Sequence, residues 1–257
     1  MTVQLRGVRV GYAADGEPRR EVLHGVDVDA PPGSITAILG PNGVGKTTLL
    51  NVALGWIAPW SGTVSVSGRR LTDIPAHERG RLVSLVPQSD HISFEYSILE
   101  YVLLGRAPYI APMELPTAED LEIARSALER VGMGSMADHG ILETSAGERQ
   151  LVLLARALAQ EPRALLLDEP SAHLDLANKR RLVGLLRAQS ELGRAVVLTV
   201  HEPEFAAAVA TAVVLLHEGR VLAAGSPGAV LTSELLSRLY GIPIRVHRTE
   251  DGPLFSW

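Results

Sequence analysis

One short stretch of the sequence has the residue types and spacing needed to bind phosphate groups. The segment "GPNGVGKTT", residues 40–48, fits the pattern G-x-x-x-x-G-K-[ST]. Its glycines let backbone N–H groups point at phosphate oxygens, Lys46 places a positive charge on the β- and γ-phosphates, and the Thr47 hydroxyl can ligate Mg²⁺. A glycine-rich turn before a helix is the simpler alternative, but a buried-strand pattern precedes the loop and a helical pattern follows it. We expect phosphates to contact the whole loop: Gly40, Pro41, Asn42, Gly43, Val44, Gly45, Lys46, Thr47 and Thr48.

An acidic pair supplies the partner that such a loop needs for a metal ion. In "ALLLDEP", residues 164–170, the apolar residues predict a buried strand, and Asp168 and Glu169 follow it directly. Ligands of open α/β sheets bind outside the carboxyl ends of the strands. We expect Asp168 to hold Mg²⁺ through water and Glu169 to polarise an attacking water as a general base. An acidic turn that caps the next helix is the alternative, and the presence of Lys46 favours the catalytic interpretation.

The stretch "ILETSAGERQ", residues 141–150, has two interpretations. Ser145 followed by Glu148 is the S-x-x-E pattern of a capping box, in which side chains satisfy free backbone N–H groups at a helix start. The apolar run that follows supplies the helix. The same helix start would also aim N–H groups and a helix dipole at a phosphate. The stretch by itself does not decide between an ordinary cap and half of a nucleotide site.

The periodicity of the chain indicates the elements that must position these residues. Alternating apolar and polar residues predict antiparallel strands over residues 2–12 and 21–30, at the front of the chain. Further strands are expected over 31–40, 62–71, 81–88, 163–170 and 195–202, with a closing hairpin over 212–225. Helical periodicity is found over 97–106, 117–132, 146–160 and 177–193, and another helix is expected before the closing hairpin. Weak periodicity leaves residues 245–257 unassigned.

Strands separated by helices indicate an α/β fold with a mostly parallel sheet. The front strands add an N-terminal antiparallel β part, and the helical patterns between residues 92 and 160 predict an inserted helical lobe. We expect one domain over residues 1–257, with an α/β core formed by 1–90 and 161–257 and the lobe formed by about 91–160.

The composition excludes several functional classes. The 257 residues are 46% hydrophobic, which is ample for a buried core, and they include no cysteine, so disulfides, thiolate metal sites and a cysteine nucleophile are excluded. A net charge of −5 gives no support for a nucleic-acid partner. The longest apolar run, 205–216, is shorter than the roughly 20 residues that span a bilayer, and no secretory signal is visible. We expect a soluble, cytoplasmic protein.

Five motifs together resemble those of an ABC transporter nucleotide-binding subunit, in the order typical of that family. The match runs from about Tyr12 to about Gly225. The motifs are Lys46 with Thr47, Gln88 in "LVPQS", "TSAGERQ", "LLLDEPSAHLD", and His201 in "LTVHE". The resemblance implies a P-loop NTPase core, ATP and Mg²⁺ as ligands, and ATP hydrolysis coupled to transport.

The resemblance also implies roles for four residues outside the phosphate loop and the acidic pair. Tyr12 would stack on adenine, and an ordinary strand tyrosine at a turn is the less favoured alternative. Gln88 would contact Mg²⁺ or the attacking water and link the core to the helical lobe. His201 would contact the γ-phosphate, although a histidine at a strand end is more often structural. Asp175 in "SAHLD" would lie along a dimer interface.

The segment "TSAGERQ" occupies the signature position, which the family usually writes L-S-G-G-Q or L-S-G-G-E. There, the signature of one subunit closes over the ATP held by the other, so that two copies form a homodimer with two sites. Ser145 and the Gly147 N–H would face the γ-phosphate. The sequence departs twice, with Thr144 in place of Leu and Ala146 in place of the first Gly. Alanine at position 146 adds no backbone strain only where its φ is negative.

A single cassette without a membrane span resembles bacterial importers assembled from separate subunits. Residues 97–109 and 231–246 resemble those of importers for iron–siderophore complexes, haem and cobalamin. The resemblance implies a permease that docks in a groove near residues 88–109, a substrate-binding protein, and a location on the inner face of the membrane. The alternative is a soluble ABC ATPase without a permease, for example in iron–sulfur cluster assembly. A GTPase is disfavoured because no N-K-x-D guanine motif is present.

Overall fold

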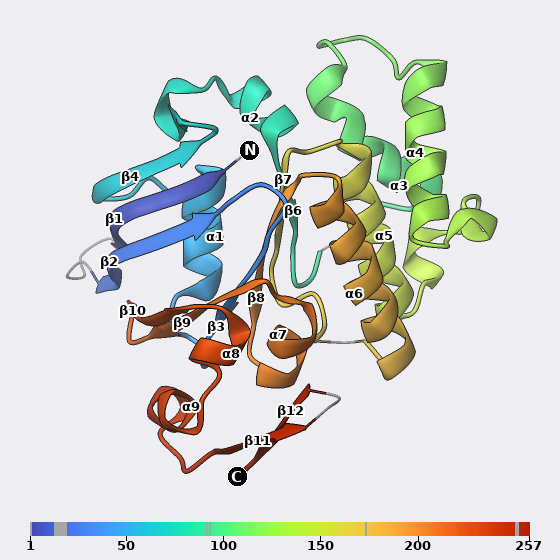
Figure 1. Ribbon diagram of the computed structural model, residues 1–257. Helices are drawn as coiled ribbons and strands as arrows, with labels where there is room; N and C mark the ends of the chain where they lie inside the picture. Colours follow the sequence, from blue (N-terminus) through green and yellow to red (C-terminus); the bar gives the residue numbers. More distant parts are fainter. Residues whose placement is uncertain (1, 13–19, 91, 93, 173, 250–251) are drawn as a thin grey trace.

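The computed structural model describes residues 2–12, 20–90, 92, 94–172, 174–249 and 252–257. These residues form a central six-stranded sheet, a four-stranded antiparallel sheet and a C-terminal two-stranded hairpin, with helices around them. In Figure 1, the antiparallel strands lie on one side of the central sheet and a group of helices lies on the other. The predicted α/β fold class is confirmed.

The central sheet has the strand order β10-β9-β3-β8-β7-β6. All neighbouring pairs are parallel except β9 and β10, which form the predicted closing hairpin. The strands are β3 (Ile35–Leu39), β6 (Val83–Val86), β7 (Ala164–Leu167), β8 (Ala195–Val200), β9 (Ala212–His217) and β10 (Arg220–Gly225).

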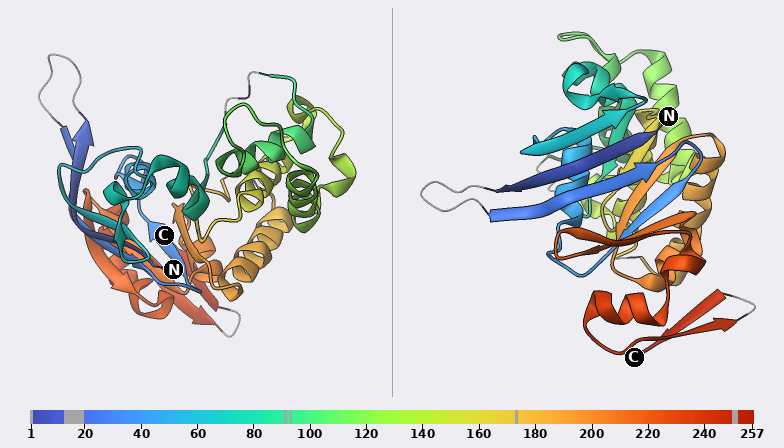
Figure 2. Two further views of the ribbon diagram at one scale, coloured as in Figure 1. Left: turned by 90° about the horizontal axis from the view of Figure 1, so that it is seen from above. Right: turned by 60° about the vertical axis from the view of Figure 1, so that its left-hand side comes forward.

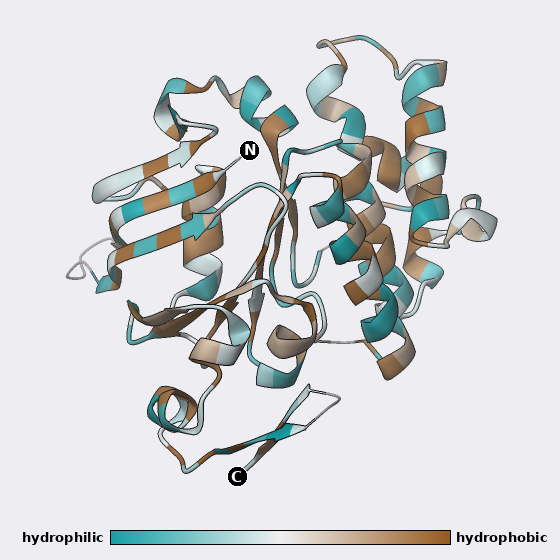
Figure 3. Cartoon of the chain, viewed as in Figure 1, coloured by the Kyte–Doolittle hydropathy of each residue, from teal (hydrophilic) through white to brown (hydrophobic). Residues whose placement is uncertain are grey.

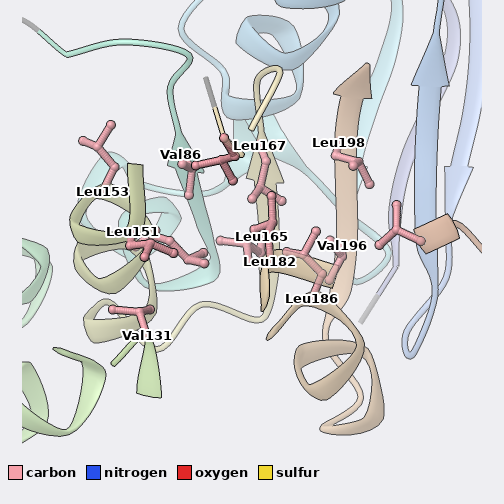
Figure 4. Packing of buried hydrophobic residues seen from close by; sticks show 14 of the residues in the cluster. Val86, Val131, Leu151, Leu153, Leu165, Leu167, Leu182, Leu186, Val196 and Leu198 are labelled. Atoms are coloured by element: carbon pink, nitrogen blue, oxygen red, sulfur yellow. The ribbon is translucent and has the colours of Figure 1, made fainter. Parts of the chain in front are cut away.

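The apolar runs of these strands follow from burial on both faces of the sheet. In β7, Leu165 and Leu167 belong to the cluster that packs against the helices, whereas Leu166 belongs to the cluster on the opposite face. Parallel strands covered on both faces read as continuous apolar runs, because neither face meets water. Figure 4 shows part of the first cluster, in which Leu165 and Val196 of the sheet pack with Leu182 of helix α6 (Leu176–Glu191).

The antiparallel sheet has the order β2-β1-β4-β5 and confirms the alternation at the front of the chain. In Figure 3, β1 and β2 carry alternating hydrophilic and hydrophobic bands, as expected for strands with only one buried face. Helix α1 (Lys46–Leu54) packs against both strands. The strands are β1 (Val3–Tyr12), β2 (Arg20–Ala30), β4 (Ser61–Val66) and β5 (Arg69–Arg70).

Three helices, α3, α4 and α5, lie together and form one arm of the molecule seen from above (Figure 2, left). Each begins with a complete capping box, with Ser97, Thr117 and Ser145 as the N-cap residues. A hydroxyl three residues before a carboxylate satisfies two free N–H groups at once, so each start is encoded locally. The helices are α3 (Ile98–Leu103), α4 (Ala118–Arg130) and α5 (Ala146–Ala159), and the 3₁₀ helix η2 (Leu104–Tyr109) follows α3.

Three elements differ from the sequence-based expectation. The single strand expected over 62–71 is a hairpin of β4 and β5, and a 3₁₀ helix begins at Leu71. Helix α2 (Ala76–Leu82) includes the first two residues of the strand expected over 81–88. The unassigned C-terminal stretch forms a hairpin of β11 (Arg245–Thr249) and β12 (Gly252–Ser256). Most of its residues are partly or fully exposed, so the hairpin has no apolar alternation for a sequence pattern to detect. The remaining helices are α7 (Pro203–Val209), α8 (Pro227–Val230) and α9 (Ser233–Tyr240).

No helix in the described part of the chain combines the length and the apolar character needed to cross a bilayer.

Replacing Leu166 with Ala is expected to lower the free energy of unfolding by about 2–5 kcal/mol, because it opens a cavity at a fully buried position of β7. Urea denaturation followed by circular dichroism measures the change. The matched control is Leu192→Ala at a side chain that is 67% exposed, which is expected to change stability by less than about 0.5 kcal/mol. Equal effects of the two substitutions would contradict the two-face packing of the sheet.

Candidate active site

The phosphate-binding segment, residues 40–48, runs from the end of β3 into the first turn of α1, between a strand and a helix as the sequence predicts. Gly43 and Gly45 adopt φ values of +76° and +106°, in a region that side chains rarely enter. At Gly40, a Cβ would collide with the carbonyl oxygen of Leu216 on β9. The glycines of the motif are therefore required by the backbone of the loop and by its close approach to the sheet.

Lys46 is the first residue of α1, and its side chain lies inside the loop. The residue is only 5% exposed, and its Nζ donates to the carbonyl oxygens of Gly40 at 2.9 Å and Pro41 at 3.1 Å. The same ammonium lies 3.1 Å from Oε1 of Glu169. A buried ammonium is stable only when it is paired and hydrogen-bonded, and these three oxygens meet that condition.

Asp168 follows β7 and is held by hydroxyl groups from two sides. The Thr47 hydroxyl donates to Oδ2 at 2.7 Å, and the Thr199 hydroxyl of β8 donates to Oδ1 at 2.6 Å. Thr199 also accepts a 2.9 Å hydrogen bond from the N–H of Glu169, so one hydroxyl orients both acidic residues. Sequence reasoning missed Thr199. The signal available was a single polar residue within the otherwise apolar strand "AVVLTV".

Glu169 is the point at which the predicted catalytic residues meet. Gln88 donates from Nε2 to its Oε2 at 3.2 Å, and Nδ1 of His201 lies 3.3 Å from the same oxygen. Glu169 has a φ of +44°, a left-handed conformation that costs about 1–3 kcal/mol for a residue with a side chain. Gln88 and Glu169 follow β6 and β7, and His201 follows β8, so all three lie at the carboxyl edge of the sheet.

The Nδ1 atom of His201 is buried, and no hydrogen-bond partner for it is found among the described residues. Its distance to Glu169 is therefore a contact between polar atoms without hydrogen-bond geometry. Buried polar atoms without a hydrogen-bond partner are unusual in native proteins. This nitrogen is therefore a candidate for hydrogen bonding to a bound ligand.

A cavity of about 530 Å³ lies over the phosphate loop. Tyr12 of β1 borders it with a ring that is 50% exposed, and the Tyr12 hydroxyl is 3.0 Å from Oγ1 of Thr48. Arg20 and Val22 of β2 also line the cavity, and sequence reasoning did not select them because no motif includes them. The described residues that line it are Tyr12, Arg20, Val22, Asn42, Gly43, Gly45, Lys46, Thr47, Thr48, Gln88 and Glu169.

The signature segment forms the start of α5, and the capping-box prediction is confirmed. The Ser145 hydroxyl donates to Oε2 of Glu148 at 2.7 Å and accepts from the Glu148 N–H at 3.3 Å. The Ser145 hydroxyl and the Ser145 backbone N–H, which donates to the same oxygen at 2.9 Å, hold the pKa of Glu148 below its ordinary value. Ala146 is the first residue of the helix and has helical backbone geometry, so its side chain adds no strain there.

Eight predicted site residues are not among the described residues that line the cavity: Gly40, Pro41, Val44, Asp168, His201, Ser145, Gly147 and Asp175. The last three lie on other segments, at the starts of α5 and α6. Asp175 caps α6 by accepting the N–H of Asn178 at 2.7 Å. A Cβ at Gly147 would make only an ordinary 3.5 Å contact with Nδ2 of Asn178, so packing within the chain does not require glycine there.

The oxygen atoms at the carboxyl edge fit a hard divalent cation. Thr47 and Asp168 present a hydroxyl and a buried carboxylate, and the amide of Gln88 lies at the same end of the site. Mg²⁺ is usually bound by one or two carboxylates together with substrate phosphates rather than by a cage of protein ligands. No group of three or more His, Cys, Asp or Glu that could hold a metal ion occurs in the described part of the chain.

The chain is similar to known proteins over nearly its whole length. The family model described as "ABC transporter" matches residues 23–172. Over 251 residues the chain is 39% identical to the hemin import ATP-binding protein HmuV of Gloeobacter violaceus, which covers 95% of this chain and 90% of that protein. It is 35% identical over 253 residues to the "Probable iron chelatin transport ATP-binding protein" of Helicobacter pylori, which covers 98% of this chain and 97% of that protein.

The solved structures that are similar in fold include the following two. One is described as "An inward-facing conformation of a putative metal-chelate type ABC transporter", with a TM-score of 0.85, 30% identity, and coverage of 99% of this chain and 95% of that chain. A bacterial ABC transporter cassette solved as a dimer has a TM-score of 0.78, 26% identity, and coverage of 88% of this chain and 98% of that chain. The predicted family is therefore confirmed: the chain belongs to the ABC transporter family, as an ATP-binding chain that hydrolyses ATP.

Proposed function

We propose that the chain is the ATP-hydrolysing subunit of an importer that takes up an iron complex, either a siderophore or haem, or cobalamin, through a separate permease. The observation that carries the hydrolytic part is the meeting of Lys46, Gln88 and His201 at the carboxylate of Glu169. The transport part is supported by relatives named for hemin import and iron chelatin transport, which match 95% and 98% of the chain.

The geometry supports a division of labour within one site. Tyr12 borders the cavity with a half-exposed ring on which adenine would stack, and the N–H groups of residues 40–48 would hold the phosphates. Glu169 would accept a proton from water as the water oxygen bonds to the γ-phosphorus and the bond to the β,γ-bridging oxygen breaks. Gln88 would orient that water. His201 would place its buried ring nitrogen toward the γ-phosphate.

Thr47, Gln88 and Asp168 would hold Mg²⁺, which when bound neutralises charge on the β- and γ-phosphates. The chain's own contribution is to orient the Asp168 carboxylate before any ligand arrives. The hydrogen bonds from Thr47 and Thr199 serve this purpose, because each occupies one carboxylate oxygen from a different side.

The remaining site residues are proposed to act on the ATP held by a second copy. Ser145 and Gly147 open a helix whose N–H groups and dipole favour an anion, yet they lie outside the cavity of their own chain. A close approach by another molecule would explain the glycine at 147. A two-fold homodimer would bring the helix start to the partner's phosphates and place Asp175 at the interface. A similar bacterial cassette was solved as a dimer.

A second groove fits the proposed permease. It has a volume of about 780 Å³ and is lined by residues of α2, β6, η2 and α5. Trp56 and Leu104 border it with side chains that are 68% and 45% exposed. Arg106 secures η2 through a 2.9 Å ion pair with Asp120, so this wall has a defined position. We propose that the permease binds in this groove at the inner face of the membrane. It would contact both the helical lobe, about 91–160, and the core, 1–90 and 161–257.

Substrate contacts lie in other subunits in this proposal, including the substrate-binding protein, so the names of the relatives are what supports the cargo. No observation on this chain favours the soluble alternative in cluster assembly.

Glu169→Gln is expected to lower the ATPase rate by at least about a hundredfold, because an amide cannot accept the proton from water. ATP-dependent dimerisation is expected to persist, because the amide keeps the size of the carboxylate and one acceptor oxygen, and the phosphates of bound ATP pair with the Lys46 ammonium that the substitution leaves without its carboxylate. Phosphate release and size-exclusion chromatography with and without ATP measure the two effects. Lys46→Ala serves as the comparison and should lose both. Turnover by the Glu169→Gln variant would show that Glu169 is not the base.

Ala146→Gly is expected to leave the fold intact and to maintain or raise ATPase activity, because Ala146 already has the negative φ that glycine would also accept. Activity and thermal melting of the two proteins, measured side by side, test this expectation. A clear loss of activity with unchanged melting would mean that the Ala146 methyl group is itself needed by the site.

Trp56→Asp is expected to reduce recovery of the permease when the tagged chain is pulled down from membranes, because it places a charge in the apolar wall of the groove. ATP binding should not change. Leu192→Asp, at the exposed C-cap position that follows α6, is the matched control. Mass spectrometry identifies the recovered subunits, and recovery of no permease by the unmodified chain would favour the soluble alternative.

A further inference from the structure

The C-terminal part of the chain contacts the active site through one hydrogen bond. The hydroxyl of Tyr240 donates to the backbone carbonyl oxygen of His201 at 2.7 Å. Tyr240 is the last residue of α9, and His201 lies between the end of β8 and the start of α7. Figure 1 shows α9 and the hairpin β11–β12 together at the end of the molecule below α7. The assigned functions of the site make no use of this contact.

The local structure holds Tyr240 in place. Leu236 and Leu239 are buried, and the N-cap Thr232 accepts the N–H of Leu235 at 3.3 Å. Gly241 ends α9 in a left-handed conformation, which glycine adopts without strain. The returning chain is tied to the helix, because the Ser237 hydroxyl accepts the N–H of Ile244 at 2.8 Å.

The surroundings of the Tyr240 hydroxyl make it a permanent donor. Burial, reinforced by the negative charge of Glu204, raises the pKa of Tyr240 well above its ordinary value, so the phenol stays protonated. A cavity of about 230 Å³ lies beside it, and the described residues that line it are His201, Glu202, Pro203, Glu204, Tyr240, Ile242, Ile244, Phe255 and Trp257. Loss of the hydroxyl would remove this donor from the carbonyl oxygen of His201.

We propose that Tyr240 is a positioning residue for His201, acting through the histidine backbone. The inference rests on the proposed role of His201 at the γ-phosphate. The carbonyl bond holds the end of β8 while Nδ1 of the ring lies 3.3 Å from Oε2 of Glu169. A shift of the backbone at 201 would move the ring relative to both Glu169 and the phosphate. The C-terminal unit, residues 233–249 and 252–257, thereby sets the geometry of a catalytic contact.

A purely structural role is the competing interpretation, because β12 packs against α7 and the unit adds buried area. The two interpretations differ in what a single lost hydroxyl does. A positioning role changes the chemical step and the environment of the His201 ring, whereas a structural role changes only stability.

The test compares Tyr240→Phe with Ser237→Ala, which removes a hydroxyl from the same helix without touching His201. Tyr240→Phe is expected to lower kcat by about three- to tenfold, with the KM for ATP unchanged within about twofold, because one hydrogen bond near the reacting groups is lost. Ser237→Ala is expected to leave kcat unchanged even where it lowers the melting temperature. Equal kcat values for Tyr240→Phe and the unmodified chain would overturn the proposal.

A second measurement does not depend on turnover. The chain has eight histidines, and the ring resonance of His201 in histidine-labelled protein is assigned by its loss in His201→Ala. Tyr240→Phe is expected to shift this resonance, and Ser237→Ala is not. An unmoved resonance would overturn the proposal even if kcat fell. Full activity of His201→Ala would instead contradict the proposed role of His201 and leave the resonance test of Tyr240 intact.

A double-mutant cycle completes the design. In single-turnover reactions on the His201→Ala background, adding Tyr240→Phe is expected to cause no further loss, because the hydroxyl acts through the missing ring. A further loss equal to that seen in the unmodified chain would show that Tyr240 acts independently of His201, and would overturn the proposal.

Discussion

The buried ion pair between Lys46 and Glu169 is the interaction on which the arrangement of the site depends. The side chains are 5% and 13% exposed, and the two charged atoms are 3.1 Å apart. Removing one member of such a pair leaves an uncompensated buried charge, which costs about 3–5 kcal/mol. Lys46 begins α1 and Glu169 follows β7. The ion pair therefore forms only if the start of α1 and the end of β7 keep their relative positions. The strand between β3 and β7 is β8. Its Thr199 forms hydrogen bonds with both Asp168 and Glu169 and thereby fixes the end of β7 relative to β8.

Strain at the site is balanced by the sheet beneath it. Glu169 is held at a positive φ, and Gly43 and Gly45 hold the loop in conformations that few residues accept. Such conformations persist only where the surroundings over-determine them. Here the strands below are buried on both faces, with Leu165 and Leu166 packed on opposite sides. A firm two-sided core therefore allows the carboxyl edge of the sheet to carry strained, chemically useful geometry.

The sequence predicts those features of the fold and the site that are formed by residues close together in the chain. The phosphate loop, the acidic pair and the capping box at Ser145 each lie within a few residues, so their chemistry can be inferred from spacing. Thr199, Arg20 and Tyr240 were not found, because their partners lie on elements distant in sequence and no short motif joins them. The hairpin β11–β12 was missed for another reason. Its strands are largely exposed and are joined by backbone hydrogen bonds. Their side chains therefore do not alternate between apolar and polar, which is the pattern that predicts a strand.

In the proposed homodimer, the signature segment completes the site of the partner rather than that of its own chain. Ser145 is fully occupied as an N-cap, and its bonds with Glu148 define the direction in which the free N–H groups of α5 point. Packing within the chain does not require glycine at position 147, which supports the proposed contact of this helix start with the ATP of a second copy. The same N-terminal turn of α5 therefore forms the helix cap and the proposed phosphate contact. Rigid capping is the condition for recognition, because a frayed helix would lose both the aligned N–H groups and the dipole.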